Sequence, residues 1–223
     1  MVALFILAII VGALAIEFVV GKRDGRQLVV STTQSSTETV MPQVPSNTMF
    51  HRGHTWARME TDGTVRVGMD EFARTLAGAP EKVDLPGLGN HVSQGELGWS
   101  VQRGGRDIPM LSPLDGEIVS VNDSVTNDPG IVETSPYEDG WIIQIRPTNL
   151  NVDRRNLLSG RIARHWLDDA YERLAQYFNP ELGAVLNDGG ELACGVIDEI
   201  EADRYAEAVR MFFLAEFDAD TEV

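Results

Sequence analysis

The sequence is poor in cysteine, in lysine and in positive charge. Cys194 is its single cysteine, so the chain can form neither an internal disulfide nor a thiolate metal cluster of its own. Its only lysines are Lys22 and Lys82, and 18 Lys and Arg residues stand against 34 Asp and Glu residues, which gives a net charge of −16. A protein that binds duplex nucleic acid needs a basic face to neutralise phosphates. The composition therefore argues against nucleic acid as a partner.

Signatures of catalysis and of cofactor binding are also missing. The sequence has no Gly-Lys-Ser/Thr phosphate loop and no serine in a nucleophile elbow. His51 and His54 have a spacing that would suit a metal on a helix, but Gly53 lies between them and no acidic or sulfur ligand is near in sequence. We therefore predict that the chain is not an enzyme and holds no metal and no cofactor.

The first twenty residues form a long apolar run that carries one charge, Glu17. At about 1.5 Å per residue this run would span roughly 30 Å, the hydrocarbon thickness of a bilayer. Lys22, Arg23 and Arg26 follow it, and the positive-inside rule then places the N-terminus outside and the rest in the cytoplasm. The pattern predicts a single transmembrane helix over residues 1–21 in the inner (cytoplasmic) membrane, with the bilayer and an integral membrane complex as partners. Glu17 is then either an interfacial carboxylate or a contact to a partner helix.

Residues 22–48 are interpreted as a basic juxtamembrane segment followed by a flexible linker. From residue 31 to residue 48 the chain is rich in Ser, Thr, Gln and Pro and poor in large apolar residues. Such a composition cannot bury a core. The folded part is expected to begin at Met49.

Short alternating apolar runs, separated by turn signals such as Asp-Gly and Pro-Gly, fill residues 49–158. They cover residues 64–67, 82–85, 97–101, 117–121 and 141–145. Many short strands at such spacing predict a β-rich barrel or sandwich. One helical pattern lies among them, over residues 68–78.

Beyond residue 158 the apolar spacing becomes helical, and we expect an acidic helical extension over residues 159–223. Residues 161–178 and 203–214 each form an amphipathic pattern. The first has its apolar face at Ile162, Trp166, Leu167, Ala170, Leu174 and Tyr177, and the second at Tyr205, Ala208, Val209 and Phe212. Ten acidic and two basic residues fall between 191 and 223. This acidic end is either a solvated helix face or a docking surface for a basic partner.

The β-rich segment also contains a series of ordered motifs. They are His-x-Trp at 54–56, Gly-x-Val-x-Val-Gly at 63–68, Leu-Pro-x-x-Gly at 85–89, Ser-Pro-x-x-Gly-x-Ile-x-x-Val-Asn at 112–122 and Pro-Tyr-x-x-Gly-Trp-Ile-Ile-x-Ile at 136–145. In this order they resemble the glycine cleavage system H-protein family, over roughly residues 51–158. The resemblance implies a lipoyl-domain-like barrel-sandwich hybrid, followed here by C-terminal α-helices.

Within that resemblance the lipoyl attachment site differs. The family carries lipoate in amide linkage on a lysine near a β-hairpin tip, in a Glu-Ser-x-Lys pattern. Trp99 stands here for the glutamate, and Gln102 occupies the lipoyl-lysine position. A glutamine amide is not a nucleophilic amine, Lys22 flanks the predicted membrane span, and Lys82 belongs to another predicted strand. The resemblance therefore implies a non-lipoylated relative.

The same hairpin offers a candidate docking site. Gly104 and Gly105 can supply the positive φ angles of a tight turn. Arg103 and Arg106 flank that turn beside Trp99, and Arg and Trp are common anchors at protein interfaces. The tip is either a docking site for a partner or an exposed loop with solvated charges.

Two functional hypotheses follow. In the first, the chain is a non-catalytic, membrane-anchored accessory subunit that stabilises a larger membrane complex, such as a respiratory or photosynthetic assembly. In the alternative, it is a lipoyl-carrier-related protein that docks on lipoate-handling enzymes of the glycine cleavage type, or a membrane-surface sensor that uses Arg103 and Arg106. We prefer the first hypothesis, because the family's lysine is absent.

Overall fold

The computed structural model describes residues 44–178 and 195–214. The β-strands are β1 (Thr48–His51), β2 (Thr55–Met59), β3 (Val65–Met69), β4 (Lys82–Asp84), β5 (His91–Val92), β6 (Leu97–Arg103), β7 (Arg106–Leu111), β8 (Gly116–Val121), β9 (Ile143–Pro147) and β10 (Leu158–Ser159). The helices are α2 (Glu71–Ala77), α3 (Asp123–Asn127), α4 (Ile131–Thr134), α5 (Leu150–Asp153), α6 (Gly160–Phe178) and α7 (Ala202–Phe213), with 3-10 turns η1 (Arg154–Asn156) and η3 (Val196–Glu199).

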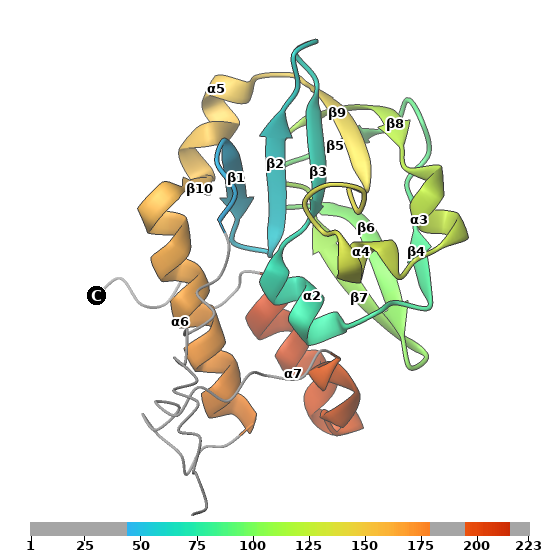
Figure 1. Ribbon diagram of the computed structural model, residues 1–223, viewed down its shortest axis with the longest axis vertical. Helices are drawn as coiled ribbons and strands as arrows, with labels where there is room; N and C mark the ends of the chain where they lie inside the picture. The colour runs from blue at the N-terminus through green and yellow to red at the C-terminus, as the bar shows by residue number, and fades with distance from the viewer. Residues whose placement is uncertain (1–43, 179–194, 215–223) are drawn as a thin grey trace, which may run out of the picture. The chain divides into compact units, whose positions relative to one another are not determined.

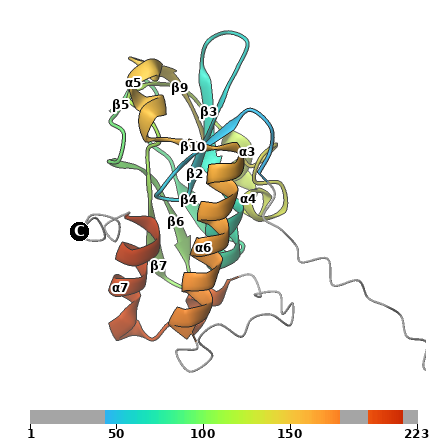
Figure 2. The same cartoon turned by 90° about the vertical axis from the view of Figure 1, so that its left-hand side faces the viewer.

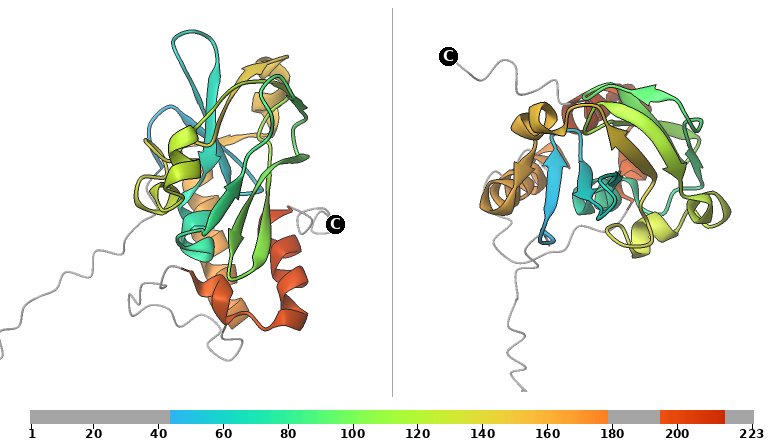
Figure 3. Two further views of the ribbon diagram at one scale, coloured as in Figure 1. Left: turned by 90° about the vertical axis from the view of Figure 1, so that its right-hand side faces the viewer. Right: turned by 90° about the horizontal axis from the view of Figure 1, so that it is seen from above.

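The strands form two antiparallel sheets (Figure 1). The larger sheet has the order β10-β1-β2-β3-β9-β8-β5, and the smaller has the order β4-β6-β7. Both contribute to one hydrophobic core, with Val67 and Ile143 from the larger sheet and Val101 and Ile108 from the smaller. Figure 3 shows the long β6–β7 hairpin of the smaller sheet reaching toward α7.

Two glycines explain why the sequence motifs tolerate no side chain at their positions. A Cβ atom on Gly68 would meet the Trp56 indole at 2.8 Å. That indole is 1% exposed, and its Nε1 donates to the Pro136 carbonyl at 3.0 Å. A Cβ atom on Gly116 would lie 2.3 Å from the carbonyl oxygen of Arg146 on the neighbouring strand. Close packing of this kind leaves no room for even a methyl group.

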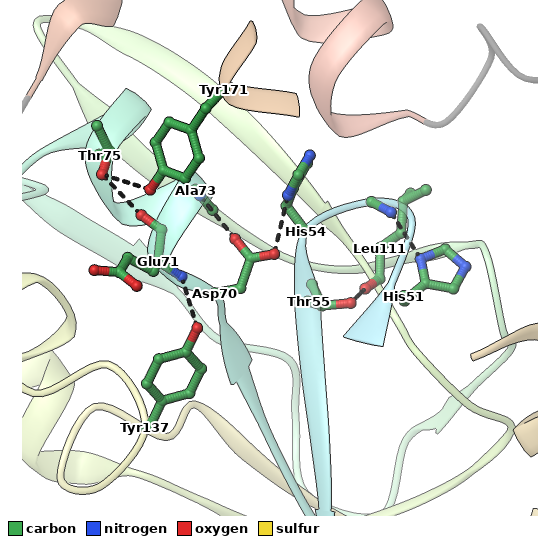
Figure 4. A network of polar contacts seen from close by, with 11 residues as sticks. His51, His54, Thr55, Asp70, Glu71, Ala73, Thr75, Leu111, Tyr137 and Tyr171 are labelled. Atoms are coloured by element: carbon green, nitrogen blue, oxygen red, sulfur yellow. Dashed lines mark hydrogen bonds and ion pairs between the residues drawn. The ribbon is translucent and has the colours of Figure 1, made fainter. Parts of the chain in front are cut away.

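A buried carboxylate starts α2 and joins three parts of the fold (Figure 4). Asp70 is fully buried, and its Oδ1 accepts from the backbone N–H of Ala73 at 2.8 Å, as an N-cap does. Its Oδ2 lies 2.9 Å from Nδ1 of His54, which is 1% exposed. The His54 ring is stacked between Phe72 on α2 and Trp166 on α6, at centroid distances of 4.0 and 4.5 Å. The pair therefore has a structural role.

The helices after the strands pack onto the same core. Figure 2 shows α6 and α7 next to each other, with α7 beside β7. Phe212 of α7 is 2% exposed, and its ring lies 5.6 Å from that of Phe72 and 5.8 Å from that of Tyr177 at the end of α6. Phe213 is fully buried. The segment from Gly195 to Leu214, called the C-terminal extension below, is thus part of the folded body.

The predicted fold class is wrong in its transmembrane helix. No helix within residues 44–178 and 195–214 is long and apolar enough to cross a membrane. The longest of them, α6, is amphipathic: charged residues such as Arg161 and Glu172 occupy the face opposite its buried residues. The segment expected to span the bilayer, residues 1–21 with Glu17, lies outside the described residues. The structure supports a β-sheet-rich fold followed by helices.

Candidate functional site

The β6–β7 hairpin holds the position at which the family resemblance expects a lipoyl-lysine. Its two-residue turn consists of Gly104 and Gly105, with φ angles of 57° and 70°. Positive φ at both central residues is the geometry of a type I′ turn, whose twist suits two adjacent antiparallel strands. Gln102 pairs with Asp107 across the hairpin, one step back from the turn.

Because side chains alternate along a strand, the hairpin has two faces of different character. The inner hairpin face consists of Trp99, Val101, Arg103, Arg106 and Ile108, of which Trp99, Val101 and Ile108 are buried. The outer hairpin face consists of Ser100, Gln102 and Asp107, together with Lys82 and Asp84 of the neighbouring strand β4. No residue of this outer face is buried.

Of the predicted docking residues, Trp99, Arg103 and Arg106 lie on the inner hairpin face, while Glu17 lies outside the described residues. Trp99 is 2% exposed, within the core. Arg103 donates to the Asp198 carboxylate at 2.9 Å and to the Ala79 carbonyl at 2.6 Å. These contacts tie the hairpin tip to the end of α2 and to η3.

Arg106 is held in a similar way by the C-terminal extension. Its Nη1 donates to the carbonyl oxygens of Ile197 and Ile200, at 3.1 and 2.8 Å. Its guanidinium lies over the Tyr205 ring, 4.9 Å from the centroid, and the Tyr205 hydroxyl donates to the Asp107 carbonyl at 2.8 Å. Arg103 and Arg106, which the sequence indicates as docking residues, thus bind other parts of the same chain.

A close approach of two glycines adds to these contacts between the hairpin tip, the end of α2 and the C-terminal extension. Gly78 ends α2 with φ 65° and ψ −157°, a backbone region open essentially to glycine. A Cβ atom there would lie 2.8 Å from the Cα atom of Gly195, whose N–H donates to the Thr75 carbonyl at 2.8 Å. Gly195 itself has φ 84°. The approach lets the backbone of the C-terminal extension reach α2 directly.

We expect Gly78→Ala to lower the free energy of unfolding by about 2–3 kcal/mol, because it adds backbone strain and an overpacked contact to Gly195. Gly105→Ala is the matched control: its φ is also positive, but a Cβ atom there meets no atom within 4 Å. It should cost only about 1 kcal/mol. Urea unfolding measures both, and equal losses would show that the Gly78–Gly195 approach contributes nothing.

The outer hairpin face carries a different set of groups. Gln102 donates from Nε2 to Oδ2 of Asp84 at 3.1 Å, and Lys82 forms an ion pair with the other carboxylate oxygen of Asp84. Lys82 lies directly opposite Gln102 in the β4–β6 pairing. The Gln102 amide does not fit covalent attachment of a lipoyl group, because its nitrogen is delocalised and not nucleophilic. Lys82 belongs to a different strand from Gln102, and only the strand register reveals that the two residues lie opposite each other.

A separate depression with a volume of about 460 Å³ lies near the end of β1 and includes His51, Arg52 and Arg155 in its lining. His51 is 9% exposed and accepts from the Gly53 N–H at 3.1 Å. Burial, helped by the neighbouring charges of His54 and Arg52, lowers the pKa of His51 from 6.5 to about 4. Within the described part of the chain, no three His, Cys, Asp or Glu side chains gather closely enough to hold a metal ion.

The lowered pKa of His51 predicts a loss of stability in acid. Between pH 6.5 and about 4 the unfolded chain binds a proton at His51 that the folded chain excludes, so stability falls as the pH falls through this window. The total loss from this group approaches ~3 kcal/mol. His51→Gln should therefore unfold with a shallower pH dependence than the wild type in urea titrations at pH 7.5, 5.5 and 4. The exposed His91→Gln is the control, and a wild-type profile that matches His51→Gln would contradict the assignment.

Comparison with known proteins identifies the family of the domain that contains this hairpin. The family model described as Glycine cleavage H-protein matches residues 48–170. The "Glycine cleavage system H protein" of Enterobacter sp. (strain 638) is 40% identical over 106 residues, which cover 48% of this chain and 82% of that protein. That of Psychrobacter sp. (strain PRwf-1) is 35% identical over 119 residues, covering 53% and 94%. The crystal structure of a glycine cleavage system H protein from Mycobacterium marinum matches with a TM-score of 0.50 and 29% identity, over 56% of this chain and 98% of that one.

These relatives correct the sequence-based predictions of function, partners and location. The predicted function as an accessory subunit of a membrane complex is wrong, because the relatives are H proteins of the glycine cleavage system. The predicted partners, an integral membrane complex and the lipid bilayer, and the predicted inner-membrane location are wrong as well. They depended on a membrane-spanning helix, and none is found among the described residues. The alternative, a carrier-related protein of the glycine cleavage type, agrees better with the relatives.

Family membership also bears on catalysis. The prediction that the chain is not an enzyme is confirmed by the match to H proteins, which are carrier subunits and not catalysts. The match covers more than half of this chain, and the relatives are matched over most of their own length. The chain therefore belongs to the glycine cleavage H-protein family.

Proposed function

We propose that this chain docks, as a carrier-family protein, on lipoate-handling enzymes of the glycine cleavage type. The observation that supports this is the contrast between the two faces of the β6–β7 hairpin. The inner hairpin face is occupied by the core and by the C-terminal extension, whereas the outer hairpin face is accessible around Gln102. A partner that engages this hairpin therefore meets the outer face.

The outer hairpin face has the mixed charge of a surface that orients a partner. Lys82 supplies a positive charge, while Asp84 and Asp107 supply negative charges on the flanking strands. Charges at the rim of an interface mainly steer the encounter and set its register. Reversing an exposed charge there should weaken docking without disturbing the core.

The test is binding of the full chain to the purified lipoate-handling enzymes of a glycine cleavage system, by biolayer interferometry, with the Escherichia coli H protein as competitor. We expect saturable binding that the competitor displaces. Asp107→Arg on the outer hairpin face should weaken binding about tenfold. Glu172→Arg, an exposed reversal on α6, is the matched control and should leave it unchanged. No displaceable binding, or the same loss in both variants, would refute the proposal.

A further inference from the structure

The depression near the end of β1 gathers basic side chains on a chain that is otherwise acidic. Its lining includes Arg52, Arg155 and His51, and none of its lining residues is an aspartate or a glutamate. The chain as a whole carries a net charge of −16. A concave site of about 460 Å³ is large enough for a small molecule. The lining therefore favours a small ligand with negative charge.

His51 contributes a neutral N–H donor to this lining. The Gly53 N–H donates to Nδ1 of the ring at 3.1 Å, so the proton of the neutral ring lies on Nε2 (Figure 4). Burial lowers the pKa of His51 to about 4, so the ring is neutral near pH 7. Among the described residues Nε2 has no hydrogen-bond partner, although the residue is only 9% exposed. A donor that is almost buried requires an acceptor from outside the described chain.

Arg155 contributes a positive charge to the same lining. It lies in η1 and is exposed, and within residues 44–178 and 195–214 its guanidinium forms no ion pair and no hydrogen bond. A guanidinium presents its N–H donors in a fixed fork that matches two oxygens of one phosphate or carboxylate. Arg52, between β1 and β2, adds the positive potential of a second guanidinium.

One wall of the depression is rigid because its polar groups are already paired. The Gln94 amide donates to the carbonyls of Pro113 and Asp153 at 2.8 and 2.9 Å, and its Oε1 accepts from Asn156 at 2.7 Å. The nearby carboxylates are occupied as well: Asp115 accepts from the Gln94 N–H at 2.6 Å, and Asp153 accepts from the Asp115 N–H at 3.2 Å. The wall is thus formed before any ligand binds, which lowers the entropic cost of binding.

We propose that this depression binds the phosphate group of a small phosphate monoester. The fork of Arg155 suits two phosphate oxygens and the Nε2–H of His51 suits a third, while Arg52 adds positive potential around the dianion. A carboxylate has one charge and two oxygens, so it makes weaker use of these donors. The site is independent of the proposed docking, because no residue of the outer hairpin face contributes to its lining.

The test is an NMR titration of the full chain, labelled with ¹³C-histidine, with inorganic phosphate and with glycerol phosphate at constant ionic strength. We expect a saturable shift of the His51 ring resonance, which is identified by its absence from His51→Gln. The ring resonance of His91, an exposed histidine outside the lining, should stay in place. Acetate should bind at least about tenfold more weakly than phosphate.

Two neighbouring arginines give the matched variants. Arg155→Gln should weaken phosphate binding about tenfold. Arg154→Gln removes the same charge from an exposed residue outside the lining and should leave binding unchanged. Thermal unfolding checks that both surface substitutions leave the fold intact, and the wild-type titration needs no variant to locate the ligand.

Three results would overturn the proposal. The first is a His51 resonance that does not respond to phosphate, and the second is acetate that binds as tightly as phosphate. The third is equal weakening in Arg155→Gln and Arg154→Gln, which would show general ionic attraction without a site. None of these results bears on docking to lipoate-handling enzymes, which the interferometry measurement tests separately.

Discussion

Asp70→Ala is expected to lower the free energy of unfolding by about 3–5 kcal/mol. The substitution removes the N-cap of α2 and leaves His54 buried without its 2.9 Å partner, between the rings of Phe72 and Trp166. A buried polar group without a partner pays its full desolvation cost, and the helix loses its first capped N–H. Urea unfolding followed by tryptophan fluorescence measures the change.

Asp70→Asn is the matched control, because asparagine is also a good N-cap and keeps a polar atom toward His54. It should lose clearly less stability than the alanine variant. If the two variants lose the same amount, the negative charge at Asp70, and not the cap or the hydrogen bond, is what stabilises this region. A loss below about 1 kcal/mol in the alanine variant would contradict the role assigned to the pair.

Phe212→Ala should also lower the free energy of unfolding by about 3–5 kcal/mol. Phe212 is 2% exposed, and its ring packs against Phe72 of α2 and Tyr177 of α6, so truncation opens a cavity where three helices meet. The same cavity should loosen the C-terminal extension and speed amide exchange around Arg106. Urea unfolding and hydrogen exchange with mass spectrometry give the two readouts.

Glu207→Ala provides the reference on the same helix, since Glu207 is exposed and alanine is an excellent helix former. Its unfolding free energy should change by no more than about 0.5 kcal/mol. Should Phe212→Ala behave like Glu207→Ala, the C-terminal extension would be an independent appendage rather than part of the folded body.

Local periodicity predicted much of the fold. The expected strand at 82–85 corresponds to β4 (Lys82–Asp84), and the one at 117–121 to β8 (Gly116–Val121). The expected helices at 161–178 and 203–214 correspond to α6 (Gly160–Phe178) and α7 (Ala202–Phe213). Alternation and 3.6-residue spacing are local signals, so they need no knowledge of partners.

Burial was less predictable where a residue lies at the end of an element. The spacing predicts Ile162 on the buried face of α6, but it is 68% exposed, whereas the next residue, Ala163, is fully buried. β1 (Thr48–His51) and β2 (Thr55–Met59) were missed, since their residues show no clean alternation. Their formation depends on pairing with β3 and β10.

The geometry of the candidate site was the hardest feature to predict, because it depends on contacts between segments that are far apart in the sequence. The sequence alone indicates Trp99 and Arg103 as candidate docking residues, because their contacts within the fold, such as that of Arg103 to Asp198, involve residues far along the chain. The opposition of Lys82 and Gln102 is a matter of register between two strands. The family motifs indicated the fold around the site, but the contacts of the tip to Ile197, Asp198 and Ile200 come from the C-terminal extension, which follows the part matched by the family model.

The contacts between the hairpin tip and the C-terminal extension can form only late in synthesis. Asp198, the partner of Arg103, is 95 residues further along the chain. At roughly 5–20 residues per second, the ribosome adds that partner about 5–20 s after the hairpin has been made. For that interval Arg106 lacks the carbonyls of Ile197 and Ile200, and Arg103 has only the Ala79 carbonyl. In a nascent chain stalled before residue 195, both arginines should therefore be more accessible to solvent than in the finished protein.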